Sequence, residues 1–189
     1  MTAPQTPDTD EMGRLETVVA KHPKALQFKA RDSVTERRYV LKFQPEDEPF
    51  NLTHGTLAGP DALSSRPYVF ADNTSGSLLA FYHLGPRLSG HKGIVHGGLT
   101  AVILDECMGR ACFPLLDGKI AVTAKLELEY KSPIPVDSLV YILAETTSQQ
   151  GRKATVEATV RDAEDGRDLV KAKGLFVEPK WASTLTQVM

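Results

Sequence analysis

The chain has little cysteine, few aromatic residues, almost no net charge and no long apolar run. Among its 189 residues only 2 are cysteine and 1 is tryptophan, and 22 basic against 24 acidic residues give a formal net charge of −2. This balance removes the electrostatic basis for binding nucleic acid or an anionic membrane surface. No apolar stretch approaches the roughly 18–20 residues that a bilayer-spanning helix needs. We therefore expect a globular protein with no nucleic-acid partner and no membrane span.

The two cysteines and the amino-terminal residues bear on the cellular location of the protein. Cys107 and Cys112 are five residues apart within a predicted helix, so their side chains do not face each other well. Neither a disulfide nor a zinc site is indicated, and a reducing compartment is the simplest interpretation. Residues 1–11 are polar and acidic, and they lack the basic and apolar regions of a secretory signal. The sequence predicts a cytoplasmic location and no bound metal, and a mitochondrial location stays open.

The first third of the chain carries weak structural signals. Apolar spacing predicts a short helix over Glu11–His22, which ends there because Pro23 disfavours helix at the preceding residue. A strand is expected at Arg38–Gln44. The following segment, Pro45–Arg66, is rich in Pro, Gly, Asp and Ser, as is typical of a lid or of a wrap against a partner subunit. We divide the chain into an amino-terminal extension, a principal domain and a tail: residues 1–66, 67–180 and 181–189.

The rest of the chain predicts one helix among several strands. Leu99–Leu116 is apolar on most sides, so this helix must be largely buried. A strand is expected at Ser77–Leu84, which Gly85-Pro86 ends. Period-two alternation bounded by turn residues predicts four more strands: Ile120–Tyr130, Leu139–Thr146, Arg152–Arg161 and Leu169–Val177. One helix embraced by a curved antiparallel sheet is an economical way to bury such a cylinder. The predicted class is α+β.

A glycine pair stands where the long helix must begin. Gly97 and Gly98 carry no side chains, so a ligand can approach backbone N–H groups that have no partner within the helix. Such a terminus favours negative charge, including the oxyanion of an acyl-transfer intermediate. The alternative is that the two glycines only permit a tight turn into the helix.

Asp105 is the unusual acid of this helix. Helical spacing places it on a face of small and apolar residues, where an ionised carboxylate needs a partner or an opening onto a cavity. A structural cap or a hydrogen bond to neighbouring backbone is the alternative to a catalytic role. Glu106 points elsewhere and has Arg110 four residues on, so we expect a solvated surface pair.

These residues form part of a longer pattern. His96-Gly97-Gly98, an acid nine residues after the histidine at Asp105, and the segment 121–135 with its Lys-Ser-Pro-Ile-Pro turn occur together. The combination resembles the phenylacetate-pathway branch of the hotdog-fold thioesterases and the mammalian long-chain acyl-CoA thioesterases of that branch. The resemblance covers about Ser77–Val177. It implies the hotdog fold, in which one long helix is wrapped by a curved antiparallel sheet.

The resemblance also implies roles for individual residues. Asp105 would act as general base or nucleophile on a thioester, and the backbone N–H of Gly97 or Gly98 would hold the developing oxyanion. Thr123, at the family's Ser/Thr position, would reach in from the partner subunit to orient water or the carboxylate. His96 would shape the loop and form hydrogen bonds near the thioester rather than take the proton itself.

One position departs from the family pattern. Many relatives carry Asn or Gln six residues before the histidine of the motif, where this chain has Gly90 beside His91. Either His91 substitutes for that amide, or the oxyanion depends on backbone donors alone. Coenzyme A would need cations for its phosphates, and the candidates at strand ends or turns are Lys131, Arg152, Lys153 and Lys173.

The expected activity is hydrolysis of an acyl-CoA thioester to the free acid and CoA, with no metal or redox cofactor and with coenzyme A only as part of the substrate. The resemblance implies a homodimer with shared active sites, and a tetramer is a second possible assembly. A carrier-protein thioester is an alternative substrate. A hotdog hydratase is disfavoured because its D-x-x-x-x-H pattern is missing around the helix. A non-catalytic acyl-CoA-binding module is the remaining alternative.

Overall fold

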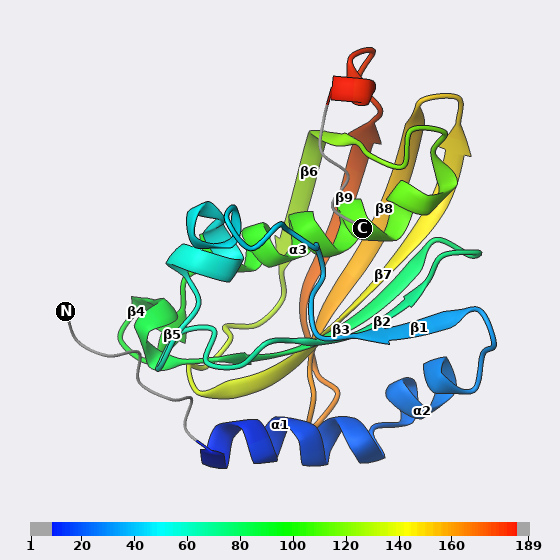
Figure 1. Ribbon diagram of the computed structural model, residues 1–189. Coiled ribbons are helices and arrows are strands. Elements are labelled where there is room, and N and C mark those ends of the chain that lie inside the picture. Colours follow the sequence, from blue (N-terminus) through cyan, green and yellow to red (C-terminus); the bar gives the residue numbers. More distant parts are fainter. Residues whose placement is uncertain (1–8, 185–189) are drawn as a thin grey trace.

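A single antiparallel sheet curves around one helix, as the α+β prediction requires (Figure 1). The computed structural model describes residues 9–184. The sheet has seven strands in the order β1-β2-β3-β7-β8-β9-β6. In that order their bounds are Val34–Arg37, Tyr68–Asp72, Ser77–Leu84, Ser138–Gln150, Lys153–Asp162, Asp168–Val177 and Val122–Tyr130. A separate two-stranded ribbon pairs β4 (Ser89–His91) with β5 (Ile94–Val95).

The long helix α3 (Gly97–Cys112) lies against the concave face of the sheet and continues into a 3-10 turn at Phe113–Leu115. The prediction that it is largely buried is confirmed, since Ile103, Leu104 and Met108 are fully inaccessible to solvent. Side chains of this kind each stabilise the fold by roughly 1.5–3 kcal/mol through burial. The helix can pack closely because β9 carries Gly174, where an added Cβ would lie 2.7 Å from the Phe176 ring.

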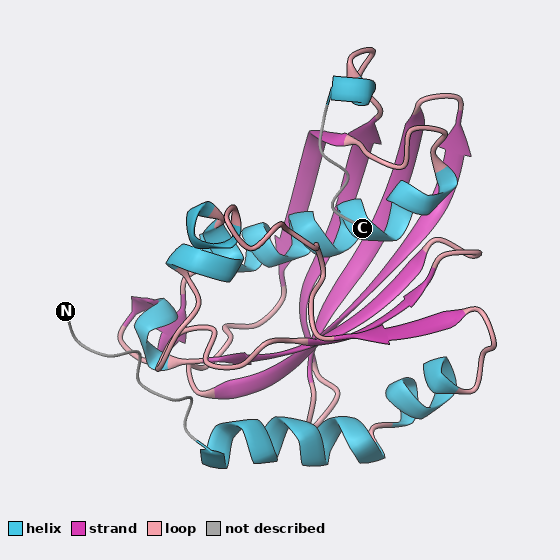
Figure 2. Cartoon of the chain, in the orientation of Figure 1, coloured by secondary structure: helices cyan, strands magenta, loops and turns pink. Residues whose placement is uncertain are grey.

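A second apolar layer covers the other face of the sheet. Helix α1 (Thr9–Lys21) confirms the short predicted helix, and α2 (Pro23–Lys29) follows it directly (Figure 2). His22 separates them and caps α2 by accepting the N–H of Lys24 at 3.2 Å. The layer contains apolar side chains of both helices and of the strands beneath them: Leu15, Val19, Phe28, Phe70, Leu79, Phe81 and Leu139. Of the helical residues that the structure describes, none forms a helix long and apolar enough to cross a membrane.

The predicted strand at Arg38–Gln44 is wrong. The strand lies just before it, at Val34–Arg37, and pairs with β2 up to the position where Arg37 faces Val69. Two steps further along this register, opposite Tyr39, the ladder would meet Pro67, which has no N–H to donate. The chain leaves the sheet there.

The segment 38–67, which we call the wrap, then crosses over α3. It contains a 3-10 turn at Glu48–Phe50 and a single π-helical turn at Leu52–Thr56. Two contacts fix it: Thr53 bonds Glu106 of α3, and the Ser64 hydroxyl lies 2.8 Å from Nδ1 of His83 on β3. Further 3-10 turns lie at Pro86–Leu88 and Ala182–Thr184. The predicted long connection therefore covers the helix of its own chain.

Candidate active site

The start of α3 presents one backbone donor that has no acceptor. His96 is the N-cap, and its Nδ1 accepts the N–H of Gly98 at 2.9 Å. Tyr130 of β6 donates its hydroxyl to the carbonyl of Gly97 at 2.8 Å. Within residues 9–184 no acceptor is placed for the N–H of Gly97. Of the two glycines, only Gly97 thus has a backbone N–H that points outward at the positive end of the helix.

Close packing around His96 explains why this corner is rich in glycine. A Cβ added at Gly98 would lie 3.0 Å from Nδ1 of His96, and one at Gly97 would lie 3.2 Å from the Tyr130 hydroxyl. A Cβ at Gly90 would lie 3.0 Å from the His96 Cα. A side chain at position 90 would therefore displace the N-cap, which accounts for the missing amide of the family pattern.

Asp105 lies at the middle of α3 and faces the edge strand β6. The hydroxyl of Thr123 donates to Oδ1 of Asp105 at 2.6 Å. The two residues belong to the same chain, so the expectation that Thr123 reaches Asp105 from a partner subunit is corrected. The reason is local: the β6–β9 register shifts between Thr123 and Lys125, and an irregularity of this kind re-aims a side chain.

The helix face that carries Asp105 is not uniform. Met108, Gly109 and Cys112 are buried, but Asp105 is only half-buried, as are Ala101 and Val102. The edge strand beside them is itself largely exposed. Asp105 thus opens toward the outside of this chain rather than into its core.

Gly97 and Asp105 cannot act on the same thioester within one chain. They are eight residues apart on one helix, which corresponds to about 12 Å along the axis. An oxyanion donor and a base or nucleophile must both lie about 3 Å from neighbouring reacting atoms. The site that one chain offers is therefore two half-sites, one at the helix start and one at its middle.

The structure brings some of the other predicted residues together and separates the rest. His91 and Lys131 line a cavity of about 400 Å³ that also includes Gly97. Arg152 and Lys153 instead lie at the exposed β7–β8 turn, where Arg152 donates to the carbonyl of Glu178 at 3.0 Å. Lys173 is on β9 and pairs with Glu157 at 3.1 Å. In the part of the chain that the structure describes, no cluster of His, Cys, Asp and Glu is placed to hold a metal.

The expectation for Glu106 is wrong. It does not form a solvated pair with Arg110 but accepts the Thr53 hydroxyl of the wrap at 2.9 Å. Burial raises the pKa of Glu106 to about 7, against the lowering effect of the Thr53 hydrogen bond. Arg110 is itself buried and donates to Asn73 at 3.0 Å. The apolar character of the surrounding helix was the available signal that neither charge is solvated.

Comparisons with known proteins show the family and the fold of the chain. The family model of the thioesterase superfamily matches residues 92–168. An uncharacterised mitochondrial protein of Candida albicans (strain WO-1) is 38% identical over 165 residues, which cover 78% of this chain and 74% of the relative. The acyl-coenzyme A thioesterase THEM4 of Rattus norvegicus is 28% identical over 137 residues, 72% of this chain and 58% of that protein.

Solved structures show the same fold. The crystal structure of the thioesterase superfamily protein RHA08564 aligns with a TM-score of 0.52 and 32% identity over 59% of this chain and 53% of that one. The chain therefore belongs to the thioesterase superfamily, and its fold is the hotdog fold that the resemblance implied. By class it is a thioester hydrolase, and in sequence it is similar to THEM4.

Proposed function

We propose that this chain hydrolyses acyl-CoA thioesters to the free acid and CoA, with Asp105 as general base or nucleophile. The observation that carries the proposal is the 2.6 Å hydrogen bond from Thr123 to a half-buried Asp105 that opens outward. The name of THEM4 and the match to the thioesterase superfamily support the acyl-CoA substrate. This chain covers 58% of the length of THEM4. We therefore transfer from THEM4 to this chain only the class of substrate, an acyl-CoA thioester.

The chemistry needs one attack and one bond cleavage. Asp105 either takes a proton from water as the oxygen attacks the thioester carbon, or attacks that carbon directly and is later freed by water. In both cases the carbonyl oxygen becomes an oxyanion, the C–S bond breaks, and CoA leaves as the thiol after it gains a proton. Thr123 bonds only Oδ1 of Asp105 and leaves Oδ2 for the water or the carbon. Thr123 is a positioning residue by this mechanism.

The oxyanion is assigned to the N–H of Gly97. His96 already engages the N–H of Gly98 at 2.9 Å, which supports a role for His96 in shaping the loop rather than in proton transfer. The positive end of α3 strengthens the Gly97 donor. His91 lines the same cavity as Gly97 and is the side chain placed to add a second hydrogen bond to the carbonyl.

A homodimer would join the two half-sites. The 9-residue strand β6 is at an edge of the sheet and carries exposed apolar side chains at Val122 and Tyr130. An edge strand of this length presents unpaired backbone N–H and C=O groups that can pair with another strand. Edge-to-edge pairing of two copies would bring Asp105 and Thr123 of each chain toward the helix start of the other. A tetramer would be a pair of such dimers.

The remaining assignments follow from position. Lys131 lines the cavity at Gly97 and is the cation best placed for coenzyme A, which would have to draw its Nζ from its present ion pair with Glu129. Arg152, Lys153 and Lys173 are farther candidates. We assign the hotdog unit to residues 67–180, the extension to 1–66 and the tail to 181–189. The cytoplasm is the proposed location. A mitochondrial location is the alternative that the printed name of the Candida albicans relative supports.

The test is release of free thiol from short, long and aromatic acyl-CoAs by wild type and Asp105→Asn. Hydrolysis that requires Asp105 supports the proposal, and the preferred chain length narrows the substrate. A folded protein that binds CoA but releases no thiol from any substrate would contradict acyl-CoA hydrolysis. Such a result would favour a binding module or a carrier-protein thioester.

A further inference from the structure

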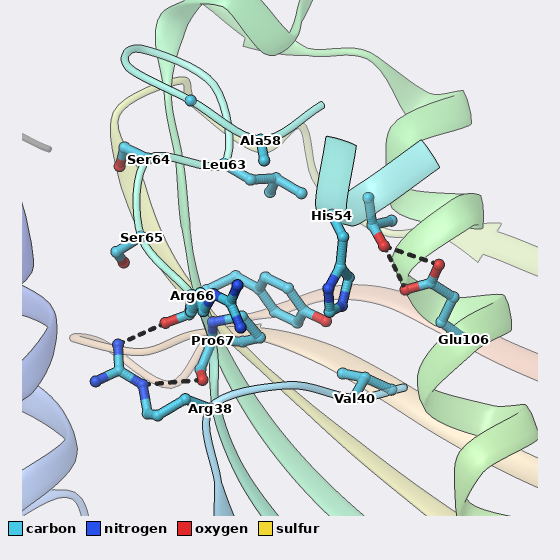
Figure 3. A pocket seen from close by; sticks show the side chains of 13 residues that line it. Arg38, Val40, His54, Ala58, Leu63, Ser64, Ser65, Arg66, Pro67 and Glu106 are labelled. Carbon is cyan, nitrogen blue, oxygen red and sulfur yellow. Dashed lines mark hydrogen bonds between the residues drawn. The ribbon is translucent and has the colours of Figure 1, made fainter. Parts of the chain in front are cut away.

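Helix α3 is fixed on two sides by different segments of the chain. On one side, Figure 3 shows the wrap hydrogen-bonded to Glu106 beside a cavity of about 450 Å³. Val40, Leu63 and Tyr82 are among the residues that line this cavity. On the other side, β6 reaches the helix through two hydroxyl groups, one at the middle of α3 and one at its first residue. The contact at the first residue lies at the oxyanion half-site.

Tyr130, the last residue of β6, makes this contact. Side chains alternate along a strand, so Tyr130 shares a face with Leu126 and Leu128, which pack against the core around α3. Its hydroxyl donates to the carbonyl of Gly97 at 2.8 Å. Because Tyr130 is 54% exposed, water could solvate this hydroxyl equally well. The need to satisfy a buried polar group therefore does not explain the bond.

The bond acts on the peptide unit that joins Gly97 to Gly98. The carbonyl of this unit accepts the Tyr130 hydroxyl, and its N–H donates to Nδ1 of His96 at 2.9 Å. The peptide unit is planar, so two partners at its opposite ends fix its orientation. Two adjacent glycines would otherwise give this corner more conformational freedom than any other pair of residues.

The preceding peptide unit carries the N–H of Gly97 and is held as well. Its carbonyl, that of His96, accepts the N–H of Leu99 at 3.0 Å. The N–H of His96 donates to the carbonyl of Leu88 at 2.8 Å, which ties the cap to the 3-10 turn before it. With the peptide units on both sides of the Gly97 Cα held, the outward N–H of Gly97 has a set direction. A donor that need not reorient as charge develops stabilises an oxyanion best.

We propose that Tyr130 is a positioning residue for thioester hydrolysis. Together with His96 it clamps the 97–98 peptide unit and so holds the Gly97 N–H in place for the oxyanion. The role rests on the proposed function, in which Gly97 is the oxyanion donor. The fit is close, since a Cβ added at Gly97 would lie 3.2 Å from the Tyr130 hydroxyl. Because β6 also carries Thr123, which orients Asp105, one edge strand positions groups of both half-sites.

Tyr130→Phe removes only the hydroxyl and tests this role in the full chain. With one acyl-CoA substrate, kcat should fall about tenfold while KM stays within about twofold of wild type, because the clamp acts on the oxyanion donor. Hydrogen exchange of the Gly98 amide, followed by NMR at a single pH, should become severalfold faster because one end of its peptide unit is released. Tyr68→Phe is the matched control. It removes a tyrosine hydroxyl from β2 on the other face of the sheet and should change neither quantity.

A double-mutant cycle separates the clamp from general damage to the helix start. His96→Ala releases the other end of the same peptide unit. Tyr130→Phe should therefore reduce kcat clearly less in a His96→Ala chain than in wild type, whereas two independent defects would multiply. Circular dichroism and sedimentation velocity confirm that each variant keeps its fold and its state of assembly.

Three results would overturn the proposal. They are a kcat of Tyr130→Phe within about twofold of wild type, an unchanged exchange rate of the Gly98 amide in that variant, and full additivity of the two substitutions. A higher KM with unchanged kcat would also overturn it, because Tyr130 would then bind the substrate. If wild type hydrolyses no acyl-CoA, the proposed function fails, and the exchange rates of Gly98 still decide whether Tyr130 clamps the helix start.

Discussion

Asp105 and Glu106 are neighbours in sequence, and each accepts a hydrogen bond from a threonine, yet their surroundings are opposite. Asp105 meets Thr123 on an exposed edge strand, whereas Glu106 meets Thr53 beneath the wrap. The 100° turn between consecutive helical residues is enough to place one carboxylate toward the outside and the other toward a buried cavity. An acid that faces a surface which a second subunit can cover is suited to chemistry. An acid that the wrap of its own chain partly covers, as it does half-buried Glu106, is suited to fixing a segment in place.

The largest expected effect comes from Asp105→Asn. The change keeps size and polarity but removes the base or nucleophile, so thioester hydrolysis should fall by about a thousandfold or more while the fold is retained. The measurement is kcat/KM by thiol release, with circular dichroism to confirm folding. Glu106→Gln is the matched control and should keep turnover within about threefold of wild type. Near-normal turnover by a folded Asp105→Asn protein would refute the assignment.

Glu106→Gln should have its effect on stability. The folded chain holds a proton on Glu106 up to about pH 7, against an ordinary pKa of 4.5. Because the folded state binds this proton more tightly, the free energy of unfolding is highest below about pH 4.5 and decreases as the pH rises to about 7. The total decrease is about 3 kcal/mol at 1.36 kcal/mol per pKa unit.

Urea unfolding of wild type and Glu106→Gln between pH 5 and 8 measures this effect. The variant should lack that part of the pH dependence and should be more stable than wild type at pH 8. Asp105→Asn serves as the control in turn and should leave most of the difference between wild type and Glu106→Gln in place, because the Asp105 charge raises the pKa of Glu106 less than burial does. An identical pH profile for wild type and Glu106→Gln would show that the wrap does not bury this carboxylate.

Thr123→Ala should have a smaller effect on catalysis than loss of Asp105. It removes the hydrogen bond that orients the carboxylate, so kcat should fall about tenfold to several hundredfold with little change in KM. Thr123→Ser keeps the hydroxyl and should restore most of the rate, which a merely structural role for the methyl group would not predict. Steady-state kinetics of both variants on one acyl-CoA distinguish these outcomes.

Thr53→Ala should have the smallest effect. The Thr53 hydrogen bond lowers the pKa of Glu106, so its removal should raise that pKa above about 7. The free energy of unfolding should fall by about 1 kcal/mol as the wrap loses one anchor on α3. NMR titration of the Glu106 carboxyl carbon measures the first effect, and urea unfolding measures the second. An unchanged or lower pKa of Glu106 would argue that Thr53 does not contact it in solution.

The sequence predicted those parts of the molecule whose signals are local. Apolar spacing located α3, and alternation located β6, β7, β8 and β9. The Gly85-Pro86 stop helped to locate β3, which is apolar and buried throughout. The short strand β2 escaped notice because Tyr68–Asp72 is too short and too uniformly apolar to alternate. The strand expected at Arg38–Gln44 was misplaced because its end depends on Pro67, which is about thirty residues away in sequence.

The candidate site likewise has one part that local sequence signals predicted and another part that they did not. Asp105, Gly97 and Thr123 stand in a motif that can be read along the chain, and the structure places Thr123 on Asp105. The partner of Glu106 could not be predicted from the helix alone, because Thr53 belongs to the wrap, more than fifty residues earlier in the sequence. The cavity between the wrap and α3, lined by Val40, Leu63 and Tyr82, likewise forms only when distant segments meet, and no local spacing marks it.

The separation of Gly97 from Asp105 along α3 has a consequence for how activity responds to dilution. When a reaction needs groups from two chains, the active fraction follows mass action rather than the amount of folded chain alone. Specific activity should therefore decline below the dissociation constant of the dimer. Inactive variants should also rescue one another. In a mixed dimer, one chain carries Asp105→Asn and the other is altered only at its helix start. One of the two shared sites then combines the intact helix start of the first chain with the intact Asp105 of the second. In dilute conditions the concentration of active dimer, and with it the total activity, would then vary roughly as the square of the protein concentration.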